Sequence, residues 1–437
     1  MVERRNVPGP PDAAFARGFA ACIPIRNAFM TPGRGLVRYA GFAAVLSAAG
    51  LPIYIHAPKF YVDTQGVTLA QLSIALFALR LFDVVQDPLL GRLSERTREF
   101  RGSMVAGAGA IMATAMAMLF AIPPMLPPIW WFALSLALLF SAFSFLTICF
   151  YAQGVARAAQ TDGNHVRLAA WRETGALIGV CIAAVLPTVL TGTGAPFLWY
   201  ALAFAAATAL ALLLMAPEWS SRGTAPRSTG LRAVLSDAIA RRLLLIALVN
   251  AAPVAVTSTL FLFFVADRLG AAGQEGWLLL LFFLSAAAAV PAWGKAAARF
   301  GARHTLMAAM TLAIVAFAFA LPLGTGDLWA FAAVCIASGA AVGADLSLLP
   351  ALFARRMAVI APSAADGFGL WSFVNKATLA LAAIVLFPIL KASGFVSGEL
   401  NGDLALWSLT LLYAGIPLGL KALALTLLAR TGKGIDV

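Results

Sequence analysis

The chain has 437 residues, of which 62% are hydrophobic and only 11% are charged. With a mean hydropathy of +0.90, this composition excludes an ordinary soluble protein and predicts a polytopic α-helical membrane protein. The apolar runs are continuous over about 20 residues and do not alternate, which excludes a membrane β-barrel. The net charge of +12 could also indicate a nucleic-acid-binding protein, and the distribution of the charges decides between the two.

The first 35 residues contain five arginines and no compact apolar segment. A cleavable signal peptide needs such an apolar core, so we expect 1–35 to be a basic cytoplasmic tail. Met30 lies just before the first apolar run and is an alternative start of translation.

Twelve apolar runs predict twelve transmembrane helices and an all-α integral membrane fold. The runs are 36–56, 67–93, 103–122, 129–153, 168–191, 196–216, 240–265, 277–297, 304–322, 328–351, 368–390 and 404–428. Because the number is even, both termini lie on the same side of the membrane.

The basic residues are distributed unequally between the two sides of this topology. Of the 31 Lys and Arg residues, 23 lie on the side of the termini, and only Lys59, Arg268 and Lys391 lie on the opposite side. The positive-inside rule therefore predicts cytoplasmic termini. We expect the membrane to be a bacterial inner membrane. The surplus positive charge reflects this topology and indicates no nucleic-acid partner. His56 and Lys59 end the first span, where we expect an interfacial position rather than an outer gate.

The chain divides into two similar parts at its longest polar stretch, Glu218 to Asp237. A short basic loop follows the second helix of each part, at 91–98 and at 294–303. We expect six-helix bundles at 36–216 and 240–428, a cytoplasmic linker at 217–239 and a C-terminal tail at 429–437. Duplicated halves around a central cavity are typical of secondary transporters. The chain has no Walker-type phosphate loop and no enzyme-like constellation, so we expect neither ATP-driven transport nor an enzyme.

The second span carries three charges where a membrane helix usually carries none. Arg80, Asp83 and Asp87 are spaced i, i+3 and i+7 and share one helical face. Each charge costs about 2.5–3.5 kcal/mol at mid-bilayer, so such groups usually face a bundle interior or a cavity. Two carboxylates with one guanidinium as charge partner predict a site for Na⁺ or a proton. The alternative is an internal salt bridge that only holds helices together.

Several other residues within the spans are candidates for substrate binding or gating. Arg172 could reach the substrate or cap a helix, and Lys376 could pair with Asp83 or Asp87 across the two halves. Asp345 could be functional or part of a packing salt bridge. Tyr151 and Trp371 could stack on a ligand or simply pack. Gly175 and Gly179 have the spacing of a close helix contact.

The second-span motif resembles that of the glycoside–pentoside–hexuronide:cation symporters, the melibiose permease family of the major facilitator superfamily. The matching pattern is Arg80-x-x-Asp83-x-x-x-Asp87-Pro88-x-x-Gly91-x-x-Ser94-x-x-Thr97. The segments at 59–63, 167–173 and 369–376 also resemble family segments, so the resemblance covers nearly the whole chain after residue 36. It implies that Asp83 and Asp87 bind the coupling cation.

The chain departs from the family pattern in the part that would contact the sugar. Cys149 occupies the aligned position of a third acidic residue, and Gln153 that of an aromatic sugar platform. Replacing a hard oxygen ligand by a thiol weakens Na⁺ binding more than protonation. Arg172 and Lys376 are retained, and Ala354-Arg355-Arg356 replaces an acidic motif.

These observations predict a cation-coupled symporter of a sugar- or glycoside-like solute that works by alternating access. We expect a monomer in the lipid bilayer, with a small-molecule substrate and no cofactor or metal beyond Na⁺ or H⁺ at Asp83 and Asp87. Two alternatives stay open: a carrier of lysolipids or other amphiphiles, and a membrane sensor or assembly factor that does not transport.

Overall fold

The computed structural model describes residues 34–50, 57, 60–61, 64–160, 165–219, 230–360, 364–396 and 401–431. Most of the expected N-terminal tail, including Met30, lies outside the described residues, as do His56, Lys59 and the end of the C-terminal tail.

The described chain is built from α-helices joined by short connections. They are α1 (Arg34–Ala48), α3 (Leu69–Arg96), α4 (Arg101–Phe120), α5 (Pro128–Gln160), α6 (His165–Val189), α7 (Pro196–Trp219), α8 (Gly230–Ser236), α9 (Ala238–Phe263), α10 (Glu275–Phe300), α11 (Ala302–Ala320), α12 (Leu328–Ile360), α13 (Ala365–Ala392), α14 (Asp403–Thr410) and α15 (Ile416–Ala429). Short 3₁₀ or π-helical segments adjoin them: η1 (Arg98–Phe100), η2 (Leu190–Thr193), η3 (Phe264–Arg268) and η4 (Leu411–Gly415).

The predicted all-α membrane fold is confirmed. In the described residues, nine helical segments are long and apolar enough to cross a membrane. One of them is the segment 403–429, which consists of α14, η4 and α15. Three more predicted spans correspond to α1, α3 and α13. Two of these, α3 and α13, carry the charged residues Asp83, Asp87 and Lys376. The protein is therefore a multi-pass membrane protein with twelve spans.

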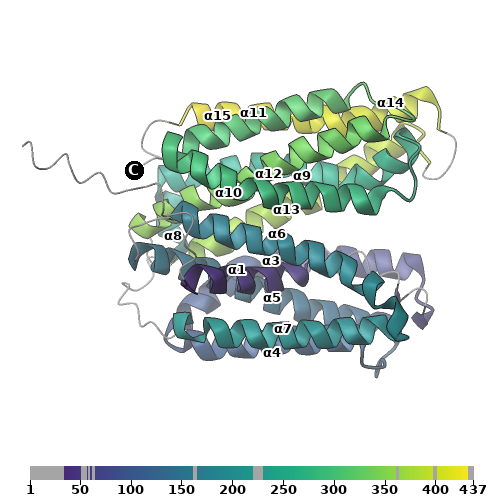
Figure 1. Cartoon of the computed structure of the whole chain (residues 1–437). Coiled ribbons are helices and arrows are strands. Elements are labelled where there is room, and N and C mark those ends of the chain that lie inside the picture. Colours follow the sequence, from purple (N-terminus) through teal and green to yellow (C-terminus); the bar gives the residue numbers. More distant parts are fainter. Residues whose placement is uncertain are drawn as a thin grey trace, which may run out of the picture.

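The helices from α1 to α7 and from α9 to α15 form two bundles. The bundles lie side by side in Figure 1, the N-terminal half in purple to teal and the C-terminal half in green to yellow. In the N-terminal half, α1 contacts α6 and α7, α5 contacts α3 and α4, and α4 contacts α7. The same pattern recurs in the C-terminal half, where α9 contacts α13 and α15, α12 contacts α10 and α11, and α11 contacts α15. This repetition indicates that the two halves share one packing plan, although their exact boundaries remain predictions.

The two halves touch along two main helix pairs, α3 with α13 and α6 with α10. Glycine allows the first pair to approach closely. A Cβ atom on Gly91 of α3 would lie 3.3 Å from the Cα of Gly369 in α13, and one on Gly369 would lie 3.0 Å from the carbonyl oxygen of Asp87. This contact brings the charged face of α3 against α13.

Two helices extend beyond their predicted apolar spans at one end of the bundle. α5 continues past 153 to Gln160, and α12 continues past 351 to Ile360. The added turns contain Arg157, Arg355 and Arg356, because a helix can continue into the polar region once its charges reach water. We call this end of the bundle, where α3, α5, α10, α12 and α15 finish, the basic end.

The contact between α1 and α6 provides a test of helix packing. A Cβ atom on Gly175 of α6 would lie 2.1 Å from the carbonyl oxygen of Ala40 in α1. We expect Gly175→Ala to cost about 1–3 kcal/mol, because the new methyl group forces the helices apart. The melting temperature (Tm) of the detergent-solubilised protein measures this. The control is Gly107→Ala in α4, whose added methyl group meets no atom within 4 Å. Equal Tm values for the two variants would contradict the packing described.

A second test concerns the start of α9 at the basic end. Asp237 accepts a 2.7 Å hydrogen bond from the backbone nitrogen of Ala240 and a 2.9 Å hydrogen bond from Nε of Arg356. The hydrogen bond from Arg356 lowers the pKa of Asp237 below its ordinary value of 3.8. The stabilisation from this group is therefore present above that value and is lost as the pH falls through the pKa of the folded state.

We expect Asp237→Ala to lower stability near pH 7 by about 0.5–2 kcal/mol, as for other helix-capping residues. The difference from the unmodified protein should shrink as the pH falls below 3.8 and through the pKa of the folded state. Tm measured against pH checks both points, and a difference that does not change with pH would refute the assignment.

Candidate functional site

The two acidic residues of α3 share a single ammonium group that comes from the other half of the protein. Nζ of Lys376 in α13 lies 2.7 Å from Oδ1 of Asp83 and 3.0 Å from Oδ1 of Asp87. Asp87 is fully buried and Asp83 is 8% exposed. The pairing across the halves that the sequence suggested for Lys376 is therefore present in the structure.

Neutral oxygen and amide groups surround this ion pair. Ser144 of α5 donates a 3.2 Å hydrogen bond to Oδ1 of Asp83 and accepts one from Lys376. Ser372 donates to Oδ2 of Asp87, and Gln86 donates to Asp83 over 3.0 Å. Carboxylate and hydroxyl oxygens are the ligands that hard cations prefer. We call Asp83, Asp87, Ser144, Ser372 and Lys376 the carboxylate site.

The carboxylate site has a formal charge of −1, from two carboxylates and one ammonium group. The position of the Arg80 side chain lies outside what the structure describes, so its role as charge partner stays a prediction. The salt-bridge alternative is realised here too, with Lys376 as the described partner. An excess carboxylate beside an ion pair leaves capacity for one further positive charge.

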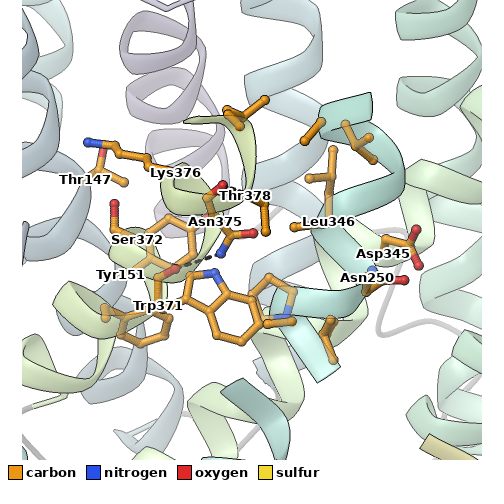
Figure 2. A pocket seen from close by; sticks show the side chains of 18 of the residues that line it. Thr147, Tyr151, Asn250, Asp345, Leu346, Trp371, Ser372, Asn375, Lys376 and Thr378 are labelled. Atoms are coloured by element: carbon orange, nitrogen blue, oxygen red, sulfur yellow. Dashed lines mark hydrogen bonds between the residues drawn. The ribbon is translucent and has the colours of Figure 1, made fainter. Parts of the chain in front are cut away.

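A cavity of about 330 Å³ lies beside the carboxylate site (Figure 2). Its walls come from α5, α9, α12 and α13, and Lys376 lies at its edge. Its polar lining includes Thr147, Asn250, Asp345, Ser372 and Asn375. The cavity is thus lined mainly by the C-terminal half, and only α5 contributes from the N-terminal half.

Aromatic side chains form part of the same wall. Tyr151 lies 4.9 Å from the ring of Phe368, and Trp371 lies 4.9 Å from the ring of Phe353. Both Tyr151 and Trp371 also line the cavity. Both residues therefore pack against neighbouring rings and are also placed where they could contact a ligand.

Asp345 belongs to a second ion pair, which is wholly contained in the C-terminal half. Lys421 of α15 donates to Oδ2 of Asp345 and, over 2.7 Å, to Oδ1 of Asn250. Asp345 is 6% exposed and Lys421 is 3% exposed. Asp345 makes a packing salt bridge and also lines the cavity, and its functional role stays a prediction. The pair contributes no net charge to the cavity.

Arg172 lies outside the lining of the cavity. Its guanidinium stacks 3.7 Å above the centre of the Tyr151 ring, and its Nε donates a 2.8 Å hydrogen bond to Glu173. The hydroxyl group of Tyr151 donates to the same carboxylate over 3.3 Å. In this structure Arg172 therefore supports Tyr151 from behind rather than facing the cavity.

The positions expected for Cys149 and Gln153 differ from those in the structure. Cys149 lies 3.1 Å from the hydroxyl oxygen of Ser94, and Gln153 donates to the backbone oxygen of Glu218 over 2.7 Å. Neither lines the cavity, and Ser144 takes the place beside the carboxylates that we had assigned to Cys149. Five residues along a helix correspond to about 7.5 Å and to more than a third of a turn beyond a full turn, so the two side chains face different neighbours.

Several residues of the site escaped the sequence analysis. Ser144, Asn375, Asn250 and Thr147 are small polar residues, and nothing in their spacing singles them out. Ser372 lies in the 369–376 segment that resembles the family, but it was not named as a site residue. Gln86 had a usable signal, because it lies three residues after Asp83 on the same helical face.

A continuous apolar core lies between the cavity and the basic end. This core joins Ile148, Ala152 and Val155 of α5 to buried residues of α9, α12 and α13, among them Leu244, Leu352 and Phe368. It therefore packs the N-terminal half against the C-terminal half on the basic-end side of the cavity. A second core lies in the N-terminal half, and a third lies in the C-terminal half.

Comparisons with known proteins agree with this architecture. Residues 37–432 match the family model described as MFS/sugar transport protein. A candidate sulfoquinovose importer of Salmonella typhimurium is 30% identical over 153 residues, which cover 33% of this chain and 32% of that protein. The chain thus matches about a third of the length of this relative.

Solved structures share the fold at low sequence identity. A bacterial homologue of the iron transporter ferroportin in an outward-facing state gives a TM-score of 0.69 at 14% identity, over 90% of this chain and 98% of that one. The human organic anion transporter TETRAN gives 0.64 at 17% identity, over 91% and 100%. A variant of the fucose:proton symporter of E. coli gives 0.64 at 12% identity, over 90% and 98%.

The family match spans nearly all of the described chain and agrees with both the helix arrangement and the resemblance found in the sequence. The protein therefore belongs to the MFS/sugar transport protein family, within the major facilitator superfamily of membrane transporters.

Proposed function

We propose that the protein is a symporter that couples the uptake of a sugar-like solute to the entry of Na⁺ or H⁺. One observation carries the proposal: two buried carboxylates of the N-terminal half share an ammonium group of the C-terminal half at the edge of the cavity. Any cation that binds Asp83 and Asp87 acts directly on a contact between the halves.

The coupling follows from the cost of burying charge. An ionised group inside a protein is expensive unless it is paired, and among the described side chains Lys376 is the one positive partner that the two carboxylates share. Binding of Na⁺ or a proton removes the excess charge. The α3–α13 contact can then rearrange as the two halves rock around the cavity, which is how transporters of this architecture expose a site alternately to each side.

The cavity suits a small polar solute with both apolar and hydrogen-bonding faces. Its volume of about 330 Å³ lies at the lower end of the range for small-molecule sites. Tyr151 and Trp371 offer flat apolar surfaces, while Asn250, Asn375 and Thr147 offer hydrogen-bonding groups. A monosaccharide presents this combination of C–H faces and hydroxyl groups. The name of the Salmonella relative makes sulfoquinovose the first solute to test.

The basic end supports the orientation of the proposed transporter. Its arginines support a cytoplasmic location by the positive-inside rule, so we propose a bacterial inner-membrane protein with both termini inside. The cavity lies within one chain, which supports a functional monomer surrounded by lipid.

Removing either acidic residue of α3 should uncouple the protein. We expect Asp83→Asn and Asp87→Asn each to abolish cation-driven accumulation of solute in proteoliposomes, because the site then lacks the excess carboxylate. The assay measures uptake of sulfoquinovose, glucose and a panel of glycosides and uronates with imposed Na⁺ or pH gradients. Asp403→Asn, at an exposed carboxylate at the start of α14, is the control and should retain full uptake.

Accumulation that survives in both Asp83→Asn and Asp87→Asn would refute the proposal. Flux of lysolipids but of no sugar would favour an amphiphile carrier instead. Absence of any flux, together with a stable protein partner, would favour a sensor or assembly factor.

A further inference from the structure

Two asparagine side chains line the cavity from different helices of the C-terminal half. Asn250 belongs to α9 and Asn375 to α13, and Figure 2 shows them on different walls of the cavity. A side-chain amide has a donor nitrogen and an acceptor oxygen, so the partner that holds one end decides which end remains for a solute. In both residues the protein itself holds one end.

The oxygen atom of Asn250 is held by a buried lysine. Nζ of Lys421 donates a 2.7 Å hydrogen bond to Oδ1 of Asn250 and also pairs with Asp345. An ammonium group can only donate, so the oxygen of the amide must face Lys421 and the nitrogen Nδ2 must face another direction. Asn250 also interacts with Asp345, but its nitrogen carries two hydrogen atoms. Asn250 therefore keeps a donor for a group in the cavity.

The amide of Asn375 is held at its opposite end. Its Nδ2 donates a 2.8 Å hydrogen bond to the backbone oxygen of Trp371, one turn earlier in α13. A carbonyl oxygen can only accept, so the nitrogen of the amide must face Trp371, and Oδ1 is the end that remains for the cavity. The cavity thus has one amide that offers a donor and one that offers an acceptor.

We propose that Asn250 and Asn375 determine which solute the cavity accepts, with Asn250 donating a hydrogen bond to one hydroxyl oxygen and Asn375 accepting one from a different hydroxyl group. This inference rests on the proposed symport function and specifies its solute as one with at least two hydroxyl groups that are recognised in opposite senses. Lys421 is a positioning residue, because it orients Asn250 and does not itself line the cavity.

The apolar surroundings make this recognition selective. Much of the remaining lining consists of residues such as Ile148, Val254 and Leu349. In such a site, a solute that lacks the matching group leaves a polar side chain without a partner, and this loss discriminates more strongly than a missing apolar contact. The two kinds of hydrogen bond can be separated chemically. Fluorine in place of a hydroxyl group accepts weakly and cannot donate, whereas hydrogen does neither.

The first experiment uses the wild-type protein in proteoliposomes and the sugar that it accumulates, sulfoquinovose or glucose. Analogues in which each hydroxyl group is replaced singly by hydrogen or by fluorine compete for uptake. At the hydroxyl group that donates to Asn375, both replacements should raise the inhibition constant about tenfold. At the hydroxyl group that accepts from Asn250, hydrogen should raise it about tenfold and fluorine about threefold at most.

The variant Asn250→Asp assigns one of these positions to its residue. It keeps the shape of the side chain and an acceptor for Lys421, but it replaces the donor by an acceptor. Tolerance of fluorine should then be lost at one position only, with the inhibition constant of that analogue about tenfold above the value for the parent sugar. Gln274→Glu is the matched control, since it makes the same exchange at an exposed residue before α10 and should leave every value unchanged.

Two further variants test the acceptor and the positioning residue. Asn375→Leu should bring the parent sugar and both analogues at the second position to equal inhibition constants, because no acceptor remains there. The double variant Lys421→Met with Asp345→Leu removes a charge pair without leaving one charge unpaired. It frees the amide of Asn250 to turn, so tolerance of fluorine should fall at the Asn250 position and stay unchanged at the Asn375 position.

An even loss of affinity over all hydroxyl positions of the wild-type solute would overturn the inference, and this result does not depend on the folding of any variant. So would an Asn250→Asp variant that raises all inhibition constants by the same factor. If uptake is cation-coupled and depends on Asp83 and Asp87, either result rejects the inference alone. Uptake of neither sugar by the wild-type protein rejects the proposed function and the inference together.

Discussion

The structure depends on one electrostatic constraint: two carboxylates lie inside a membrane protein with a single described ammonium group between them. Taking charges out of water is costly, and a buried ion pair that loses one partner becomes strongly destabilising. Here the partners belong to different halves of the protein. The same ion pair therefore joins the two halves and balances the buried charge, so a change in the contact changes the charge balance and the reverse.

Close helix packing makes this constraint possible. Gly91 and Gly369 let α3 and α13 approach until backbone atoms nearly touch, and the side chains one turn away then meet across the interface. Ser144 from α5 and Ser372 from α13 fill the remaining hydrogen-bonding positions around the carboxylates. Larger residues at the glycine positions would separate the helices and leave the acidic groups unpaired.

The C-terminal half treats its own buried charge differently. Asp345 and Lys421 balance each other within that half, and Asn250 accepts a further hydrogen bond from the same ammonium group. This pair gives the half no excess charge and no electrostatic contact with the other half. The asymmetry between the two ion pairs explains why we assign cation coupling to α3 and treat the wall around Asp345 as part of the solute cavity.

The amino-acid sequence by itself determined the membrane class, the twelve spans and the common face of Asp83 and Asp87. These features follow from local rules: runs of apolar residues long enough to cross a bilayer, and the helical period that aligns residues three to four apart. Only the tertiary structure decided which partners the charges find. Lys376 meets both carboxylates, Ser144 rather than Cys149 lies beside them, and Arg172 supports Tyr151 from outside the cavity. These contacts depend on the relative rotation of helices far apart in the chain, which the periodicity of a single helix does not specify.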